Sequence, residues 1–198
     1  MKNVLILNIT SDVKKENIID IYCHGQSYNM KIAHETVNNI DEFQNALRDK
    51  KLDYLFLAGH ANEECFANNN FFHQSWAEIG SIICTAKCLN KDSILMLYCC
   101  KGGMVNVAYT LFAECPNIRY VLGAKQNMFP IQLTVGFNVF MYHVEFRKTD
   151  PVLAARKATD ATDIRFECFD RIDAEVNPHW HTNYCKTCAE RNESTETC

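Results

Sequence analysis

The sequence predicts an α/β protein with a doubly wound, mainly parallel β-sheet. Three observations support this: five short apolar runs, helical stretches between them, and hydrophobicity within the runs that is nearly continuous rather than alternating. Continuous hydrophobicity is typical of a strand that helices cover on both faces, which is the pattern of a parallel sheet. Strands that alternate with helices in this way imply right-handed crossovers between parallel neighbours.

The expected elements follow one another in the order βαβαβαβαβ. The strands are expected at residues 4–7 with Ile9, 30–33, 54–57, 94–98 and 119–122, and the helices between them at about 14–23, 40–49, 74–89 and 104–114. Two more helices should follow the fifth strand. The first is the apolar stretch 132–147, and the second covers 150–162, where Asp150 is a plausible cap and Pro151 occupies an early helical position.

Two longer loops are expected after the carboxyl ends of strands, at residues 61–73 and around 125–130. Ligands of open α/β sheets bind at those ends, so both loops are placed to frame a site. Beyond Asp163 the chain becomes polar and aromatic without clear periodicity. We therefore expect one domain over residues 1–163 and a C-terminal extension over residues 164–198.

Charge and hydropathy exclude several classes of protein. The formal net charge is −4 and the Lys and Arg residues are scattered, so electrostatics do not imply a nucleic-acid partner. No apolar run approaches the roughly 18 residues that a membrane span requires. The first ten residues are too short and too β-branched to be a signal peptide. These features predict a cytoplasmic protein.

The chain has 11 cysteines, an odd number with irregular spacing. In a reducing cytosol such cysteines are best interpreted as small buried hydrophobes rather than a disulfide framework. Cys23, Cys84, Cys88 and Cys115 stand in apolar segments and are expected in the core. Thiol reactivity should then be confined to one or two positions.

A histidine and a cysteine directly follow two of the expected strands. The third strand leads into Gly59 and His60, and the fourth leads into Cys99 and Cys100. If these strands are neighbours, their axes lie about 4.8 Å apart, and side chains that leave their ends come close together. A thiol nucleophile and its general base need this proximity, so His60 and Cys100 are candidate catalytic residues.

The surroundings of Cys100 suit a nucleophile. It precedes an expected helix whose first backbone N–H groups are unpaired, and Lys101 adds a positive charge, so both favour the thiolate. Gly102 and Gly103 permit a tight turn and leave room for a substrate backbone. The backbone N–H groups of Ala61 and Cys100 could together form an oxyanion hole.

Two other residues compete for these roles. Cys99 adjoins Cys100, but adjacent strand residues point to opposite faces, so only one of the two can face His60. The position nearer the helix start favours Cys100. His24, in a second His-Gly step, follows an amphipathic helix pattern and is better explained as a capping or surface residue at a helix end that Gly25 closes.

The motifs around these residues resemble those of the caspase, gingipain and separase group of cysteine peptidases, and within it they are most similar to CHAT domains. The usual Ser-Gly-His-Gly and Leu-Ser-Ala-Cys-x-Thr-Gly motifs of CHAT domains correspond to residues 58–61 and 97–103. In this alignment Cys100 is the nucleophile and Cys99 stands at the family's alanine position. Residues 123–125 and 151–158 continue the resemblance, which covers about residues 3–162.

The resemblance implies a caspase-like fold, a three-layer sandwich around the mainly parallel sheet, and a dyad of His60 and Cys100. Two departures from the family pattern stand out. Ala61 replaces the glycine after the histidine and adds a methyl group beside the substrate path. Ala58 replaces the usual serine and removes one hydrogen bond.

In this family, residues just after the first and fifth strands shape the pocket for the residue before the scissile bond. Asp12, Gln126 and Asn127 hold those positions here, and Asp12 would favour a basic side chain.

The C-terminal extension contains a candidate structural zinc site formed by His179, His181, Cys185 and Cys188. Four such ligands could hold zinc in tetrahedral coordination and fix the end of the chain. The spacing differs from that of common zinc fingers. The alternative is an exposed polar tail with reduced thiols.

Together these features predict a cysteine endopeptidase that cleaves protein substrates and needs no metal or organic cofactor for catalysis. CHAT-like domains are often joined to control modules, and some resemble effectors of bacterial defence, so control by a regulatory protein partner or by self-assembly is expected. The chief alternative is a catalytically weak or inactive caspase-like scaffold or binding module. A nucleotide or phosphate binder is disfavoured because residues 10–13 lack a glycine-rich cradle.

Overall fold

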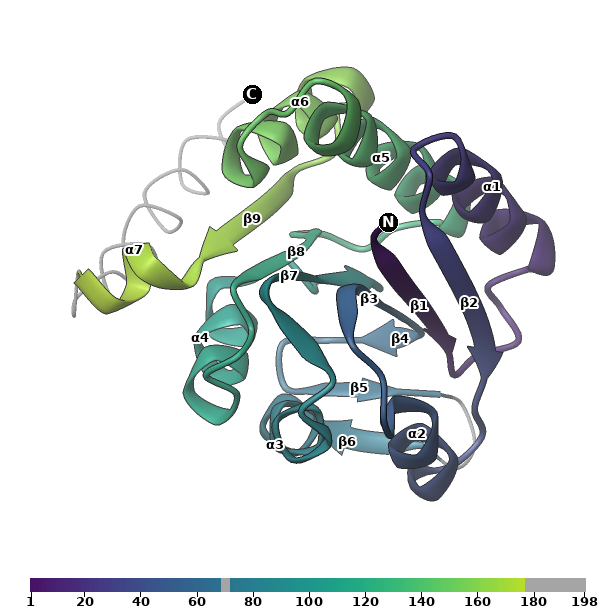
Figure 1. Cartoon of the computed structure of the whole chain (residues 1–198), viewed down its shortest axis with the longest axis vertical. Helices are drawn as coiled ribbons and strands as arrows, with labels where there is room; N and C mark the ends of the chain where they lie inside the picture. Colours follow the sequence, from purple (N-terminus) through teal and green to yellow (C-terminus); the bar gives the residue numbers. More distant parts are fainter. Residues whose placement is uncertain (69–71, 177–198) are drawn as a thin grey trace, which may run out of the picture.

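A six-stranded sheet runs through the centre of the protein (Figure 1). The computed structural model describes residues 1–68 and 72–176. The strand order is β2-β1-β3-β7-β8-β9, in which all pairs are parallel except β8 with β9. The strands are β1 (Asn3–Asn8), β2 (Lys31–Thr36), β3 (Leu52–Ala58), β7 (Leu89–Tyr98), β8 (Tyr120–Ala124) and β9 (Phe166–Asp170).

Helices cover both faces of this sheet, as Figure 1 shows. One hydrophobic core joins the sheet to α2 (Ile40–Leu47), α3 (Trp76–Ala86) and α4 (Val105–Glu114). The other joins the opposite face to α1 (Lys15–Gln26), α5 (Pro130–Met141) and α6 (Pro151–Thr162). The expected α/β fold with a mainly parallel sheet between helices is therefore confirmed. The strands and helices expected before residue 163 are present with shifted ends, and the helix expected over residues 132–147 consists of α5 and a π-helix, η1 (Tyr142–Phe146).

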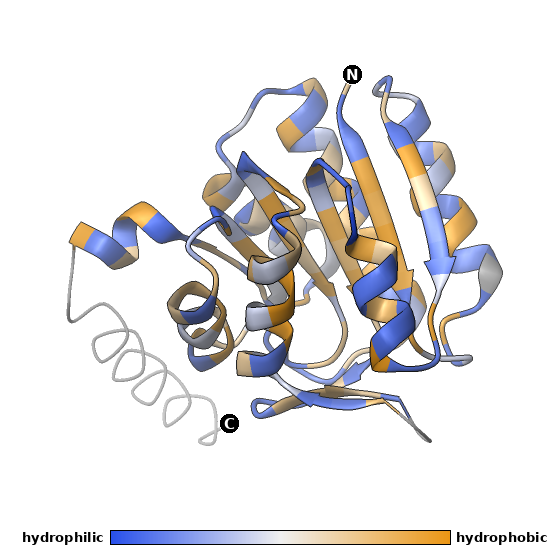
Figure 2. Cartoon of the chain, turned by 60° about the horizontal axis from the view of Figure 1, so that its bottom comes forward, coloured by the Kyte–Doolittle hydropathy of each residue, from blue (hydrophilic) through white to orange (hydrophobic). Residues whose placement is uncertain are grey.

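The alternation of side chains along each strand explains the continuous hydrophobicity of the sequence. Leu5 and Leu7 face the first core, whereas Val4 and Ile6 face the second. Strands buried on both faces must be apolar at every position. Figure 2 shows this distribution: the central strands are mostly hydrophobic, and the hydrophilic residues lie on the outer faces of the helices.

A second, small sheet occupies the region that was expected to be a loop. Three short antiparallel strands, β4 (His60–Ala61), β5 (Cys65–Ala67) and β6 (His73–Ser75), lie in the order β4-β5-β6. Strands of two or three residues are too short to produce a detectable period, which is why the sequence did not predict them. Phe66 of β5 anchors this small sheet, because its side chain is fully buried against Phe72 and Trp76.

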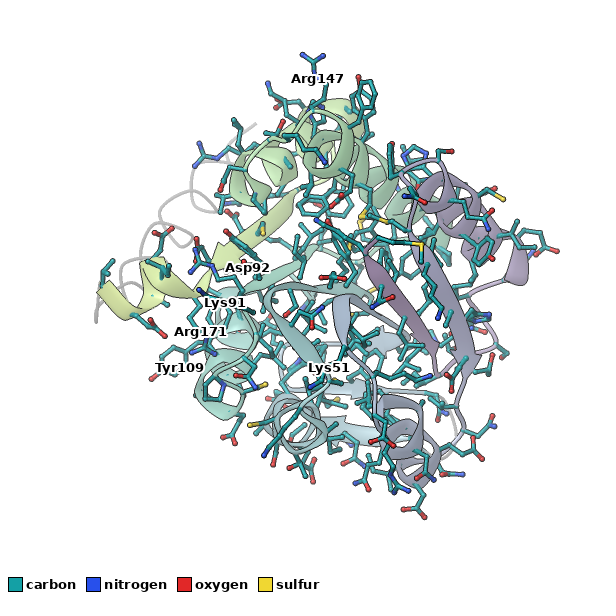
Figure 3. The ribbon with its side chains drawn as sticks, viewed as in Figure 1. Lys51, Lys91, Asp92, Tyr109, Arg147 and Arg171 are labelled. Carbon is teal, nitrogen blue, oxygen red and sulfur yellow. The ribbon has the colours of Figure 1, made fainter. Side chains whose placement is uncertain are left out.

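The sheet also continues beyond the boundary expected at residue 163. β9 adds a sixth strand, and α7 (Arg171–Val176) follows it. Arg171, labelled in Figure 3, donates hydrogen bonds from Nη2 to the carbonyl oxygens of Phe112 and Cys115 at the end of α4. Residues 164–176 therefore pack as part of the sheet domain. The C-terminal extension was expected to begin at residue 164, but residues 164–176 belong with the sheet.

None of the helices within residues 1–68 and 72–176 is both long and apolar enough to span a bilayer.

Candidate active site

The pairing of β3 with β7 brings His60 and Cys100 to one edge of the sheet. Ala58 is the register partner of Tyr98, and the N–H of Gly59 donates to the carbonyl oxygen of Tyr98 at 3.3 Å. His60 and Cys100 each stand two residues beyond that last register pair. The expectation that the two strands are parallel neighbours is confirmed, and both residues leave the sheet at its carboxyl edge.

His60 is held where β3 turns into β4. A Cβ atom on Gly59 would lie 2.6 Å from Ile9 Cγ1 and 2.7 Å from an edge carbon of the Phe66 ring. The chain therefore passes so close to two buried side chains that only glycine fits without displacement. This close passage fixes the direction in which His60 leaves the sheet.

The His60 imidazole contacts the loop that follows β1. Its Nε2 lies 2.8 Å from Asp12 Oδ2 and 3.4 Å from Thr10 Oγ1. The backbone N–H of Asp12 donates to Thr10 Oγ1 at 3.2 Å, and the backbone N–H of Thr10 donates to Asn8 Oδ1 at 3.1 Å, so this loop is itself ordered by hydrogen bonds. Because a carboxylate only accepts, Nε2 carries the proton in this arrangement. The neutral ring then has its lone pair on Nδ1.

Asp12, which was expected to bind substrate, has its carboxylate in contact with the candidate base. The side chains of His60 and Asp12 are 43 % and 53 % exposed, so water weakens the electrostatic part of this contact. A hydrogen bond of this kind still fixes the ring orientation and the tautomer of a histidine. The geometry therefore fits a positioning role for Asp12.

Cys100 lies in a tight turn that follows β7. Lys101 adopts a left-handed conformation with φ of 54°, its N–H donates to the carbonyl oxygen of Gln126, and the N–H of Gly103 donates to that of Ala124. A Cβ atom on Gly103 would lie 2.2 Å from the carbonyl oxygen of Gly123. The space beside this glycine was expected to admit a substrate backbone. It is filled instead by the backbone of β8.

The neighbouring cysteine has an opposite environment. The Cys99 side chain is 1 % exposed and belongs to the core between the sheet and α2, α3 and α4. Burial raises the pKa of its thiol well above the ordinary value. Cys100 is half-buried, which makes it the accessible member of the pair.

The sulfur of Cys100 contacts the loop between β8 and α5. The backbone N–H of Met128 donates to the sulfur at 3.3 Å, and the thiol can donate to the carbonyl oxygen of Met128 at 3.7 Å. The loop around residues 125–130 thus frames the site, as expected from its position. Within the described residues, no hydrogen bond joins His60 to Cys100.

Two backbone N–H groups were expected to serve as an oxyanion hole. The N–H of Asn62 donates to the carbonyl oxygen of Cys65, so these two residues form a hydrogen-bonded pair of the β4–β5 ladder. Along an antiparallel ladder, such pairs alternate with pairs that are not hydrogen-bonded. Ala61 opposite Phe66 is therefore a non-hydrogen-bonded pair, and the Ala61 N–H points away from β5. In the part of the chain that the structure describes, the Cys100 N–H has no acceptor either. Both donors remain available for a ligand.

The electrostatic features expected around Cys100 are weaker than the sequence suggested. Helix α4 begins only at Val105, so its unpaired N–H groups are separated from Cys100 by the turn. The Nζ atom of Lys101 lies 3.3 Å from Glu63 Oε1, which offsets its charge. The site therefore depends more on nearby backbone donors than on the helix dipole.

Several residues of this region were not foreseen. Thr10, Glu63 and Met128 lie in loops after strand ends, and only that placement could have suggested them. Gln126 was expected near the site, and its carbonyl oxygen does contact the turn at Lys101. Among the described residues, Asn127 makes no hydrogen bond to His60 or Cys100.

The second histidine considered in the sequence lies elsewhere. His24 is in the last turn of α1, where its Nε2 lies 2.7 Å from the Tyr28 hydroxyl and 3.0 Å from the carbonyl oxygen of Asn138. The helix continues through Gly25 to Gln26, so glycine does not close it as expected. Of the cysteines expected in the core, Cys88 and Cys115 are buried, whereas Cys84 is half-buried and Cys23 is exposed.

The proposed zinc ligands His179, His181, Cys185 and Cys188 lie outside the described residues. Within residues 1–68 and 72–176, no three His, Cys, Asp or Glu side chains cluster as a metal site would require.

Comparisons with known proteins give a distant structural likeness only. No family model matches the chain. No curated protein is similar to it in sequence. Among solved structures, it is similar to malate dehydrogenase from Naegleria fowleri ATCC 30863, with 11 % identity and a TM-score of 0.37. That alignment covers 76 % of this chain and 53 % of the dehydrogenase, so this chain spans about half the length of that enzyme.

Proposed function

We propose that this protein is a caspase-like cysteine endopeptidase that uses Cys100 as nucleophile and His60 as general base. The observation that carries the proposal is the β3–β7 register, in which both residues stand two positions beyond the Ala58–Tyr98 pair. The half-buried Cys100, the two available N–H donors and the contact of His60 with Asp12 add support.

In the proposed mechanism, His60 Nδ1 takes the proton of the Cys100 thiol, and the sulfur attacks the carbonyl carbon of a substrate peptide bond. The N–H groups of Ala61 and Cys100 donate to the oxyanion. The His60 proton then passes to the leaving amine, and water hydrolyses the thioester. Asp12 holds the proton on Nε2 throughout, so that Nδ1 is the atom that exchanges protons.

This chemistry needs a closer approach of His60 and Cys100 than the described arrangement provides. The imidazole is bound to Asp12 and the sulfur is bound to Met128. Catalytic hydrogen bonds often form only when substrate binds. We therefore infer that a bound substrate or substrate-like reagent completes the site, and that a regulatory protein partner or self-assembly raises the otherwise low turnover of the isolated chain.

The second candidate function is a scaffold or binding module of the same fold. Two contacts favour it: Met128 holds the Cys100 thiol and Asp12 holds the His60 imidazole, so the two groups do not form a dyad in this arrangement. The two candidates differ in whether Cys100 has chemical reactivity that depends on His60.

Labelling with a peptidyl chloromethyl ketone distinguishes the peptidase from the scaffold. We expect Cys100 to be alkylated at least about tenfold faster than any other cysteine, because it combines accessibility with a nearby base. His60→Ala should remove that advantage, while labelling of the exposed Cys23 serves as an internal control. Equal rates at Cys100 in both proteins would rule out the peptidase and leave the scaffold.

A further inference from the structure

The turn that follows His60 and the turn that follows Cys100 are joined by Glu63. Its Oε1 lies 3.3 Å from Lys101 Nζ, and its backbone carbonyl oxygen accepts a hydrogen bond from Asn106 Nδ2 at 3.1 Å. Lys101 directly follows the candidate nucleophile, and Asn106 is the second residue of α4. One residue therefore contacts both the turn and the helix on the Cys100 side.

The turn that carries Glu63 is rigidly built. Asn62 Oδ1 accepts the backbone N–H groups of Glu64 at 2.7 Å and Cys65 at 2.8 Å. The carbonyl oxygen of Asn62 accepts the indole N–H of Trp76 at 3.0 Å, and Trp76 is buried. These bonds hold Glu63 in a fixed position relative to the segment that carries Ala61 and His60.

The opposite turn is equally constrained. Lys101 stands at a positive φ, its N–H donates to Gln126, and its carbonyl oxygen accepts the N–H of Met104 at 3.2 Å. Within the described residues, the last backbone hydrogen bond between the β3 end and the β7 end is that of Gly59 with Tyr98. Beyond that bond, the hydrogen-bonded contacts between the two turns, among the described residues, are those of Glu63 with Lys101 and Asn106.

We propose that Glu63, with Lys101 and Asn106, forms a clasp that positions His60 relative to Cys100. This inference rests on the proposed function, since the spacing matters only if the two residues react together. Glu63 is a positioning residue: within the described residues it makes no hydrogen bond to the thiol or the imidazole, and it acts through the loop that carries His60.

Charge exchange across the ion pair tests the clasp. Glu63→Lys and Lys101→Glu each place like charges together, whereas the double variant restores an opposite pair. Hydrogen exchange of residues 59–67, followed by mass spectrometry, should accelerate in each single variant and return to the wild-type rate in the double variant. Glu64→Lys, a neighbouring change of the same charge, is the control and should leave exchange unchanged.

The same variants report on positioning through peptidyl chloromethyl ketone labelling. The two side chains are 39 % and 42 % exposed, so each single change should slow the labelling of Cys100 by about two- to fivefold, with recovery in the double variant. Asn106→Ala should slow it as well, because it removes the hydrogen bond to the Glu63 carbonyl oxygen.

The two measurements separate the possible failures. Unchanged exchange in the single variants, or no recovery in the double variant, would overturn the clasp. Altered exchange with unchanged, His60-dependent labelling would overturn its positioning role and leave the peptidase intact. Labelling of wild-type Cys100 that does not depend on His60 would overturn the proposed function, and the positioning role with it.

Discussion

Cys99 and Cys100 are adjacent in sequence, yet their thiols lie in opposite environments. Cys99 is buried in the core, where the loss of hydration disfavours its thiolate, and Cys100 faces the edge of the sheet. Alkylation requires both access and the thiolate. We expect brief iodoacetamide treatment of the folded protein to modify Cys100 and spare Cys99, as measured by peptide mapping. Modification of Cys99 under native conditions would contradict the described burial.

The Asp12 carboxylate is expected to control the chemistry of His60. Asp12→Ala removes the acceptor of the Nε2 proton, so the ring loses its fixed tautomer and orientation. We predict a fall of about three- to tenfold in the His60-dependent labelling of Cys100 by peptidyl chloromethyl ketone, a range reduced for the exposure of both groups. Asp12→Asn keeps an oxygen acceptor and should lose less. Equal losses in the two variants would indicate that charge, and not orientation, is the contribution of Asp12.

Sequence reasoning at the residue scale succeeded where a strand end fixes the position. His60 and Cys100 could be placed because each directly follows a buried strand. Glu63 and Met128 could not, because their contacts depend on loop paths and side-chain reach that no periodicity encodes. The same limit applied to Asp12, whose position was foreseen but whose partner was not.

At the scale of elements, the turn after β7 depends on close contact with β8. A Cβ atom on Gly103 would lie 2.2 Å from a backbone oxygen that cannot move without disturbing β8. We predict that Gly103→Ala lowers the free energy of unfolding by about 3 kcal/mol or more, measured by urea denaturation.

Gly25→Ala is a matched control for this change. Its added Cβ atom would meet Ile32 Cδ1 at 2.5 Å, which is the end of a flexible side chain, and alanine favours the α1 helix. The free energy of unfolding should change by less than about 1 kcal/mol. Equal losses in the two variants would show that the close approach of β7 and β8 is not what makes Gly103 necessary.

The elements that the sequence missed share a physical cause. β4, β5 and β6 have two or three residues each, and β9 carries polar residues such as Glu167 and Asp170 between its buried positions. Longer strands such as β3 and β7 were foreseen because burial on both faces makes them apolar throughout. Short strands and edge strands are specified by the contacts of the folded chain, and these contacts leave little trace in hydropathy.

For the whole molecule, buried thiols and phenols predict how stability depends on pH. Burial raises the pKa of Cys88 to about 12, that of Cys115 to about 11 and that of Tyr98 to about 12. Burial and the contact with Glu145 raise that of Tyr54 further. The unfolded chain loses these protons at lower pH than the folded chain, so each group contributes stability that is complete below its unfolded pKa and declines above it.

Stability should therefore fall from about pH 9 upward, where the unfolded thiols begin to ionise. Urea midpoints between pH 7.5 and pH 10.5 would measure this decline. Cys88→Ala should lower stability at neutral pH but flatten the alkaline slope by up to about 1.4 kcal/mol per pH unit. A slope that is unchanged in this variant would contradict the described burial of the thiol.

We propose that the carboxyl edge of the sheet brings together a nucleophile, a base and two N–H donors. The most direct test is a burst experiment with the p-nitrophenyl ester of an acetylated dipeptide. This substrate is activated, because nitrophenolate is a good leaving group that needs little general-acid assistance. We predict rapid release of about one nitrophenolate per protein molecule, one acyl group in the intact mass spectrum, and a thioester that peptide mapping places at Cys100. Cys100→Ala should abolish the burst, and His60→Ala should slow it. A thioester on another cysteine, or a burst whose rate does not depend on His60, would overturn the proposed peptidase.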